Sequence, residues 1–188
     1  MPKASSELKV LVRDMAMLDS ESAYRQLFDL LFRPVLRFSH AIVRSREQAE
    51  EIASDVLLML WQQRIRLMDI ENVKYYALVA ARNKALNHLK RETGKETISL
   101  SDLDVDMSWE MASPEAIFLQ GELKDKIEDA VARLPRQCKM VFKLVREDGL
   151  SYKEVAEMLE ISTKTVDAHL VNAVKKLTAL LRTEFKLT

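Results

Sequence analysis

Hydrophobic residues recur at three- and four-residue spacing from about residue 6 to residue 91. The first such row consists of Leu8, Leu11, Val12, Met15 and Leu18. This spacing places apolar side chains on one face of a helix and predicts an amphipathic helix. A second row begins near residues 20–22 and includes Leu27, Leu30, Leu31, Leu36 and Phe38. Pro34 lies inside it and is expected to kink or divide the helix, because proline lacks the N–H that a helix interior needs.

Capping residues predict where the next two helices begin. Ser45 followed by Gln48 has the pattern of a capping box, and the helix it opens should run to about Arg64. Asn72 is suited to cap a fourth helix that reaches Arg91 or Glu92. Residues 6–92 are therefore expected to form one small helical bundle.

The periodicity is lost between residues 93 and 113, where serines, threonines and aspartates are frequent. This composition predicts a linker with little regular structure. Helical patterning returns near Pro114 and continues through Ala132, and Pro135 is placed to open the following helix. We expect an all-α fold, in which residues 93–119 form a flexible acidic linker between a domain of residues 6–92 and a domain of residues 120–184.

The end of the chain has the pattern of a helix-turn-helix. Asp148-Gly149 ends the preceding helix, and Ser151 with Glu154 forms a capping box that opens a short helix to Leu159. A turn of three residues and a long helix from Thr163 follow. Glu160 occupies the first turn position, where glycine is usual because it tolerates a positive φ, so a mildly strained turn is expected.

Between these two helices, a small residue and an apolar set predict a tight crossing. Ala156 is the small residue, and the apolar set is Val155, Leu159, Ile161, Val166 and Leu170. The outward residues of the long helix are of types that contact base edges and phosphates in a major groove. The candidate DNA-contacting residues are Ser162, Thr163, Lys164, Thr165, Asp167, Ala168, His169, Asn172, Lys175 and Lys176.

Composition adds a segregated charge to this picture. The net charge is zero, but the chain holds 15 Lys and Arg against 11 Asp and Glu up to residue 91, 1 against 7 over residues 92–119, and 13 against 11 from residue 120. Cys138 is the only cysteine and is expected to be a buried apolar residue, which excludes an internal disulfide and a thiolate zinc site. No signal peptide, membrane span or catalytic motif is evident, so neither an enzyme nor a cofactor is predicted.

Two stretches of the first domain carry more than a core requires. Within residues 50–61, Ile52, Val56 and Leu60 form an inward row, while Leu58 and Trp61 project from another face. A helix that is apolar on two faces is either surrounded or awaits a partner. Residues 82–91 contain basic and amide side chains and no acidic one, which suits phosphates and base edges.

Several segments resemble sigma factors. The stretch GLSYKEVAEMLEISTKTVDAHLVNAVKKL resembles sigma region four and also the DNA-binding domain of LuxR-type regulators, and the preceding LPRQCKMVF favours the sigma factors. AEEIASDVLLMLW resembles sigma region 2.2, and NVKYYALVAARNKALNHLKR resembles regions 2.3 and 2.4. The order of these regions is similar to that of the sigma-70 family and its extracytoplasmic-function group.

The resemblance implies a cytoplasmic, non-enzymatic protein that joins core RNA polymerase to promoter DNA and is restrained by an anti-sigma factor. It implies no cofactor, metal, small-molecule substrate or membrane insertion. The polymerase-binding residues would be Glu51, Ser54, Asp55, Leu58, Trp61 and Gln62. The minus-ten element would be contacted by Tyr75, Tyr76, Arg82, Asn83, Lys84, Asn87, His88, Lys90 and Arg91, with a flipped base held near residues 66–72. The minus-thirty-five element would be contacted by the helix-turn-helix residues given above.

Two alternatives stay open. A LuxR-type regulator that does not join the polymerase accounts for residues 149–177 but leaves residues 50–61 and the basic stretch without a role. A helical adaptor or enzyme is the other, and the missing catalytic motif argues against an enzyme.

Overall fold

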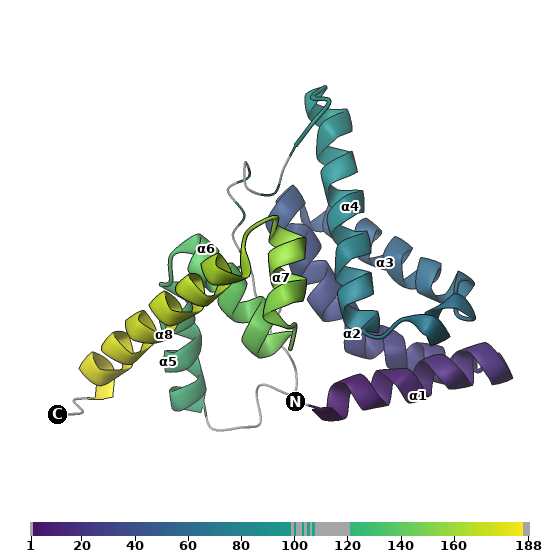
Figure 1. Ribbon diagram of the computed structural model, residues 1–188, viewed down its shortest axis with the longest axis horizontal. Coiled ribbons are helices and arrows are strands. Elements are labelled where there is room, and N and C mark those ends of the chain that lie inside the picture. Colours follow the sequence, from purple (N-terminus) through teal and green to yellow (C-terminus); the bar gives the residue numbers. More distant parts are fainter. Residues whose placement is uncertain are drawn as a thin grey trace. The chain divides into compact units, whose positions relative to one another are not determined.

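The computed structural model is built from helices joined by turns and loops (Figure 1). It describes residues 2–98, 100, 103, 105, 107 and 121–185, of which residues 2–5, 121–126, 181 and 183–185 are described by their backbone alone. These described residues contain no strand, and the predicted all-α fold is confirmed. The chain divides into two compact units, Met1–Leu103 and Asp104–Thr188.

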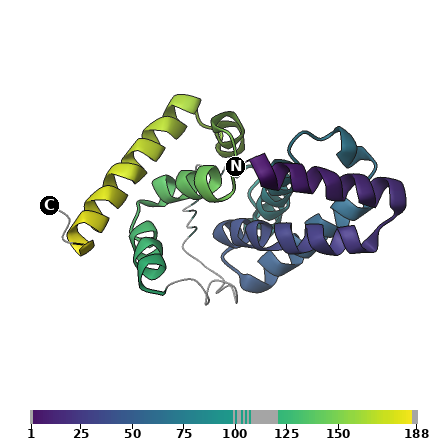
Figure 2. The same cartoon turned by 90° about the horizontal axis from the view of Figure 1, so that it is seen from below.

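The first unit is a helical bundle centred on its second helix. Its elements are α1 (Pro2–Leu18), α2 (Glu21–Val43), α3 (Arg46–Gln62), the 3-10 turn η1 (Arg66–Asp69) and α4 (Val73–Thr93). Helix α2 contacts α1, α3 and α4, and α1 lies along it (Figure 2). Because α2 is covered from three sides, Leu27, Leu31, Val35, Leu36 and Phe38 are at most 1% exposed. These five side chains form the centre of the core.

The predicted helix starts are confirmed. Ser45 and Asn72 each accept a hydrogen bond from the backbone N–H three residues later, at 3.4 and 3.1 Å. Such a bond satisfies one of the N–H groups that a helix leaves without an internal acceptor. Helix α4 ends at Gly94, whose φ of 66° is the left-handed conformation of a helix C-cap.

Three details of the first unit differ from expectation. Leu30 belongs to the second apolar row but is 41% exposed. Helix α2 continues without a break through Pro34, so a division there is wrong. The lost hydrogen bond is tolerated because Leu31 and Val35, on either side of the proline, are held in the core. Leu18 belongs to the predicted apolar row but is 73% exposed, since α1 ends there and the chain reverses through Asp19 at a φ of 48°.

The second unit holds the predicted helix-turn-helix. Its elements are α5 (Gly121–Ala132), α6 (Arg136–Phe142), the π-helical turn η4 (Lys143–Glu147), α7 (Tyr152–Leu159) and α8 (Thr163–Phe185). Helix α8 contacts α5, α6 and α7. Its inner face includes Ala173, which shares a cluster with Val131, Leu134 and Cys138. Cys138 is 6% exposed, as expected for a cysteine used as a core residue.

The turn between α7 and α8 has the strain that its sequence predicts. Glu160 adopts a φ of 57° and a ψ of 38°, the left-handed region that glycine occupies at no steric cost. Ser151 and Glu154 form both hydrogen bonds of the predicted capping box at the start of α7. The short helix is therefore fixed at both ends, by a capping box and by a left-handed residue.

Only part of the predicted linker of residues 93–119 is described. Thr93 closes α4. Among the linker residues that are described beyond it, Leu103 is half-buried and four apolar side chains are buried, those of Ile98, Leu100, Val105 and Met107. All four are at most 9% exposed, which is not what a uniformly solvated spacer would show. The helical patterning predicted over residues 114–120 lies outside the described residues. The predicted domain boundaries remain predictions.

Replacement of Glu160 by glycine should stabilise the second unit. Glu160→Gly is expected to raise the free energy of unfolding by about 0.5 to 1 kcal/mol, because the left-handed conformation strains any residue with a Cβ. Urea unfolding followed by circular dichroism measures this. The matched control, Glu157→Gly in the interior of α7, should instead lower the value by about 1 kcal/mol. A loss of stability in Glu160→Gly would contradict the assignment of strain.

Burial of His40 should make the first unit sensitive to acid. Burial lowers the pKa of this imidazole on α2 below its ordinary value of 6.5. The unfolded chain therefore takes up the proton at a higher pH than the folded chain, and protonation favours unfolding. The contribution to stability should be complete above about pH 6.5 and should decrease below it. His40→Gln should flatten this part of the stability–pH curve in urea unfolding. An unchanged slope would argue against the assignment of this pH dependence to His40.

Candidate functional site

Helix α3 buries one face and exposes the other. The predicted inward row of Ile52, Val56 and Leu60 is at most 6% exposed. The opposite face presents Glu51, Ser54, Asp55, Leu58 and Gln62, all exposed. Leu58 keeps 50% of its accessible surface although it lies well inside the helix. An apolar side chain in that position leaves a surface that a partner can cover.

The sequence predicted that Trp61 projects from the surface, but in the structure it is held against its own domain. Its ring lies 5.1 Å from the ring of Tyr24 on α2, measured between centroids. The guanidinium of Arg64 lies 4.7 Å from the centre of the same indole, and Arg64 Nε donates a 2.7 Å hydrogen bond to the Asp19 carboxylate. A cation over an aromatic face and a packed ring both hold Trp61 against its own domain. Leu58 is therefore the more accessible apolar residue of the predicted polymerase-binding set.

An aromatic row on α2 extends this surface and was not recognised in the sequence. Tyr24, Phe28 and Phe32 are half-buried, with ring centroids 6.2 and 5.0 Å apart from one to the next. The signal was present as a four-residue spacing, which places the three rings on one face. Together with Trp61 they form a half-buried aromatic strip on α2 and α3.

Helix α4 turns a row of alanines inward. Ala77, Ala81 and Ala85 have no exposed surface, and such small side chains let α4 lie close to α2 and α3. The other side of α4 presents Asn83, Asn87 and Arg91, which the sequence placed on one shared face and which are all exposed. Arg82, Lys84, His88 and Lys90 are half-buried beside them.

The two tyrosines at the start of α4 are partly enclosed. The Tyr76 hydroxyl donates a 2.9 Å hydrogen bond to Gln63 Oε1 at the end of α3. Tyr76 thereby joins the two helices across the intervening segment, a role that the sequence did not indicate. In that segment Leu67 is 1% exposed, while Ile65 and Met68 are 66% and 47% exposed. The predicted base-holding region at residues 66–72 thus has a buried anchor, and exposed apolar side chains lie on both sides of it.

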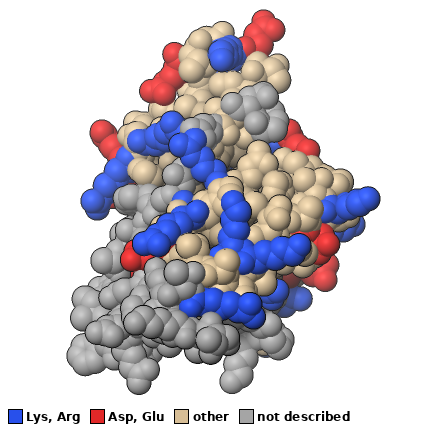
Figure 3. All heavy atoms as spheres, turned by 90° about the vertical axis from the view of Figure 1, so that its left-hand side faces the viewer, with Lys and Arg blue, Asp and Glu red and all other residues tan. Residues whose placement is uncertain are grey.

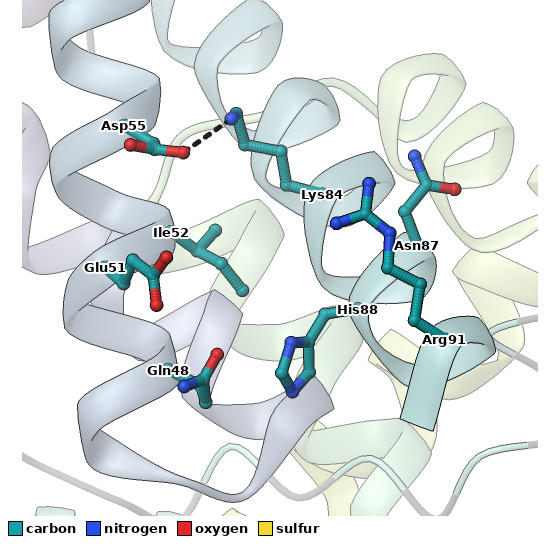
Figure 4. Close-up of a pocket in the computed structure, with 8 residues that line it drawn as sticks. All are labelled: Gln48, Glu51, Ile52, Asp55, Lys84, Asn87, His88 and Arg91. Atoms are coloured by element: carbon teal, nitrogen blue, oxygen red, sulfur yellow. Dashed lines mark hydrogen bonds and ion pairs between the residues drawn. The ribbon is translucent and has the colours of Figure 1, made fainter. Parts of the chain in front are cut away.

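One pocket unites residues that the sequence assigned to different partners. It measures about 260 Å³ and lies between α3 and α4 (Figure 4). Helix α3 contributes Gln48, Glu51, Ile52 and Asp55, and α4 contributes Lys84, Asn87, His88 and Arg91. Lys84 Nζ reaches across to Asp55 Oδ2 at 2.7 Å, and both side chains remain about half exposed. His88 Nε2 lies 3.4 Å from Glu92 on its own helix. The predicted polymerase-binding and minus-ten residues are therefore neighbours.

Most of the predicted recognition residues on α8 are exposed. These are Ser162, Thr163, Lys164, Asp167, Ala168, Asn172, Lys175 and Lys176. Ser162 Oγ accepts a 3.0 Å hydrogen bond from the Thr165 N–H, and the two hydroxyl oxygens lie 2.7 Å apart. Ser162 therefore caps α8, and both hydroxyls are engaged in this cap.

Thr165 and His169 are the exceptions among the recognition residues, because both are half-buried. The Nδ1 atom of His169 lies 3.6 Å from the Sγ of Cys138 on α6. Burial raises the pKa of the Cys138 thiol, with Lys176 acting in the opposite direction. The thiol therefore stays protonated near neutral pH and is a weak hydrogen-bonding group. His169 packs towards α6 rather than outward, which weakens its assignment to DNA contact.

The exposed side chains described on α8 include the cations of Lys164, Lys175, Lys176 and Arg182 and the carboxylate of Asp167. In the view of Figure 3, several Lys and Arg side chains lie near one another, with few acidic side chains among them. Such a surface attracts phosphates. In the part of the chain that is described, no group of His, Cys, Asp and Glu is arranged to hold a metal ion. None of the helices described there is both long and apolar enough for a membrane span.

A helix-turn-helix with an exposed basic surface, together with a helical bundle that has a separate exposed face, defines a DNA-binding transcription protein. Residues 27–94 match the model of sigma-70 region 2, and residues 124–177 match the model of sigma-70 region 4. The two matches together cover well over half of the chain, which belongs to the sigma-70 family.

Known relatives agree with this assignment. The chain is 22% identical over 182 residues to the ECF RNA polymerase sigma factor SigK of Mycolicibacterium vanbaalenii, covering 94% of this chain and 90% of SigK. It is 24% identical over 135 residues to the sigma factor FliA of Yersinia enterocolitica, covering 72% of this chain but only 53% of FliA. The sigma factor RpoE of Bartonella quintana, solved with the anti-sigma factor NepR, has a similar fold. The TM-score is 0.53 at 20% identity, over 85% of this chain and 96% of RpoE.

The ion pair between α3 and α4 should be weak but measurable. A double-mutant cycle with Asp55→Asn and Lys84→Met should give a coupling energy of about 0.2 to 1 kcal/mol in urea unfolding, as for other exposed pairs. The coupling should shrink in about 1 M salt, which screens exposed charges. A matched cycle combines Asp55→Asn with Lys90→Met. Lys90 lies on the same helix but outside the pocket, so this cycle should give no coupling. Equal coupling in both cycles would show that the 2.7 Å contact is not specific.

Proposed function

We propose that this chain binds core RNA polymerase through the exposed face of α3 and directs initiation at promoters with two elements. Helix α4 contacts and opens the minus-ten element, and α8 contacts the minus-thirty-five element as duplex. The observation that carries the proposal is the combination of regions 2 and 4 in one chain, each with an exposed surface of the chemistry that its partner requires. The protein would act without catalysis, in the cytoplasm where the polymerase is found.

Leu58 is the centre of the proposed polymerase-binding surface. Half of its surface is exposed and is bordered by the exposed polar residues Ser54, Asp55 and Gln62. An apolar centre with a polar rim is the usual composition of a protein–protein interface. The half-buried aromatic strip on α2 and α3, which includes Trp61, adds apolar area at the edge of this surface.

The ion pair between Asp55 and Lys84 connects the two proposed activities. A carboxylate that engages a cation of the polymerase no longer holds the Lys84 ammonium group, which is then available for a DNA phosphate. Polymerase binding would thus raise the affinity of α4 for DNA. Because the pair is exposed, the gain would be a few-fold, from the ~0.2 to 1 kcal/mol typical of such pairs.

A LuxR-type regulator is the other candidate, and it explains only the second unit. Such a protein would have no use for the exposed face of α3 or for the exposed amide and basic side chains of α4. The match of residues 27–94 to sigma-70 region 2 supports the sigma factor instead.

An anti-sigma protein is a further proposed partner. The similar RpoE of Bartonella quintana was solved with the anti-sigma factor NepR. We propose that an inhibitor of this kind covers the Leu58 surface and competes there with the polymerase.

The decisive variant is Leu58→Glu. Purified core RNA polymerase should bind this variant at least about tenfold more weakly, because a buried leucine contributes ~1.5 to 3 kcal/mol and a buried carboxylate costs more. Promoter-specific run-off transcripts and capture of an anti-sigma partner should fall in parallel. Val10→Glu, which replaces a 46% exposed apolar residue on α1, is the matched control and should change neither. Full activity of Leu58→Glu with the core would contradict the proposed surface, and absence of any transcript with the unaltered chain would contradict the proposed function.

A further inference from the structure

The outward face of α8 carries a carboxylate where DNA binding would favour only cations and amides. Asp167 is exposed in the second turn of the helix, near Lys164 and Ala168. No described residue forms a hydrogen bond or ion pair with the Asp167 carboxylate. A carboxylate directed at DNA is repelled by the phosphates, so it reduces affinity for every sequence unless a base donates a hydrogen bond to it.

The major groove offers such a donor at a cytosine. Its N4 amino group donates in the groove, and Asp or Glu is the side chain that accepts from it. The first turns of a recognition helix are the part that reaches base edges, and Asp167 lies four residues after the start of α8 at Thr163. The position of Asp167 and its chemistry therefore both suit a hydrogen bond from cytosine N4.

Val171 supplies a second contact on the same face. It is 45% exposed, although an apolar side chain gains nothing from water. It lies one helical turn beyond Asp167, so the two residues are about 6 Å apart along the axis. Since base pairs rise by about 3.4 Å, the two side chains reach bases at most about two pairs apart. The apolar group exposed in the major groove is the C5-methyl of thymine.

We infer that α8 selects duplex DNA in which a C·G pair and a T·A pair lie within two base pairs of each other. The Asp167 carboxylate accepts a hydrogen bond from cytosine N4, and Val171 contacts the thymine methyl group. This inference rests on the proposed function, because it assigns the sequence preference of the surface that binds the upstream element. Lys164 and Lys175, exposed on the same helix, bind phosphates and add no preference.

The test is transcription by the full chain bound to core polymerase, from a promoter library with a randomised upstream element. The unaltered protein should enrich a C·G pair at one position and a T·A pair within two positions of it. Asp167→Ala should reduce the cytosine preference at that position by roughly 5- to 30-fold and leave the other positions unchanged. Val171→Ala should reduce only the thymine preference, and deoxyuridine in place of thymine should reproduce this loss with the unaltered protein.

Glu157→Ala is the matched control, since it removes an exposed carboxylate from α7 and should not change the preferred sequence. If Asp167→Ala increased transcription from all library members equally, the carboxylate would only repel phosphates, and the inference would be overturned. Unchanged preferences in both α8 variants would overturn it as well. If the unaltered protein initiated at no library member while the core was active with another sigma factor, the proposed function itself would fail.

Discussion

A row of three alanines determines how the first unit presents its surfaces. Ala77, Ala81 and Ala85 leave no exposed surface where α4 packs on its neighbours, and larger side chains there would force the helices apart at a cost of about 1 to 3 kcal/mol each. The close approach brings Lys84 within 2.7 Å of Asp55 and leaves the opposite side of α4 open. The surface proposed for the polymerase and the surface proposed for DNA therefore depend on one packing interface, and a change in the tilt of α4 would alter both.

The second unit meets a different requirement, because its long helix must be held firmly while one face stays free. Its inner residues Val166, Leu170 and Ala173 are at most 3% exposed and pack against the shorter helices. The contact between His169 and Cys138 adds a polar link on the same side. Each unit thus has a core of its own, which is compatible with the proposed engagement of two DNA elements through two modules.

The sequence was sufficient for the elements and for which face of each helix is buried. Spacing and caps predicted the starts at Ser45, Asn72 and Ser151, because these depend on residues within one turn. The contacts between helices were not predicted, among them Tyr76 with Gln63 and Lys84 with Asp55. Periodicity fixes the orientation of a residue on its own helix, but the partner depends on how the neighbouring helix is rotated and how far it is shifted. For the same reason Trp61 and His169, expected to project outward, are partly covered by residues distant in sequence.

We propose above all that this chain gives the polymerase access to one DNA segment as duplex and to another as open strands. Permanganate footprinting of a promoter, with the chain alone and with the chain bound to core polymerase, tests this most directly, because the reagent oxidises unpaired thymines. With the core present, thymines of the upstream segment should stay unreactive because it remains duplex, and thymines one to two helical turns downstream should become reactive. With the chain alone, no thymine should become reactive at physiological salt. Thymines that remain unreactive in the presence of the core would contradict the account.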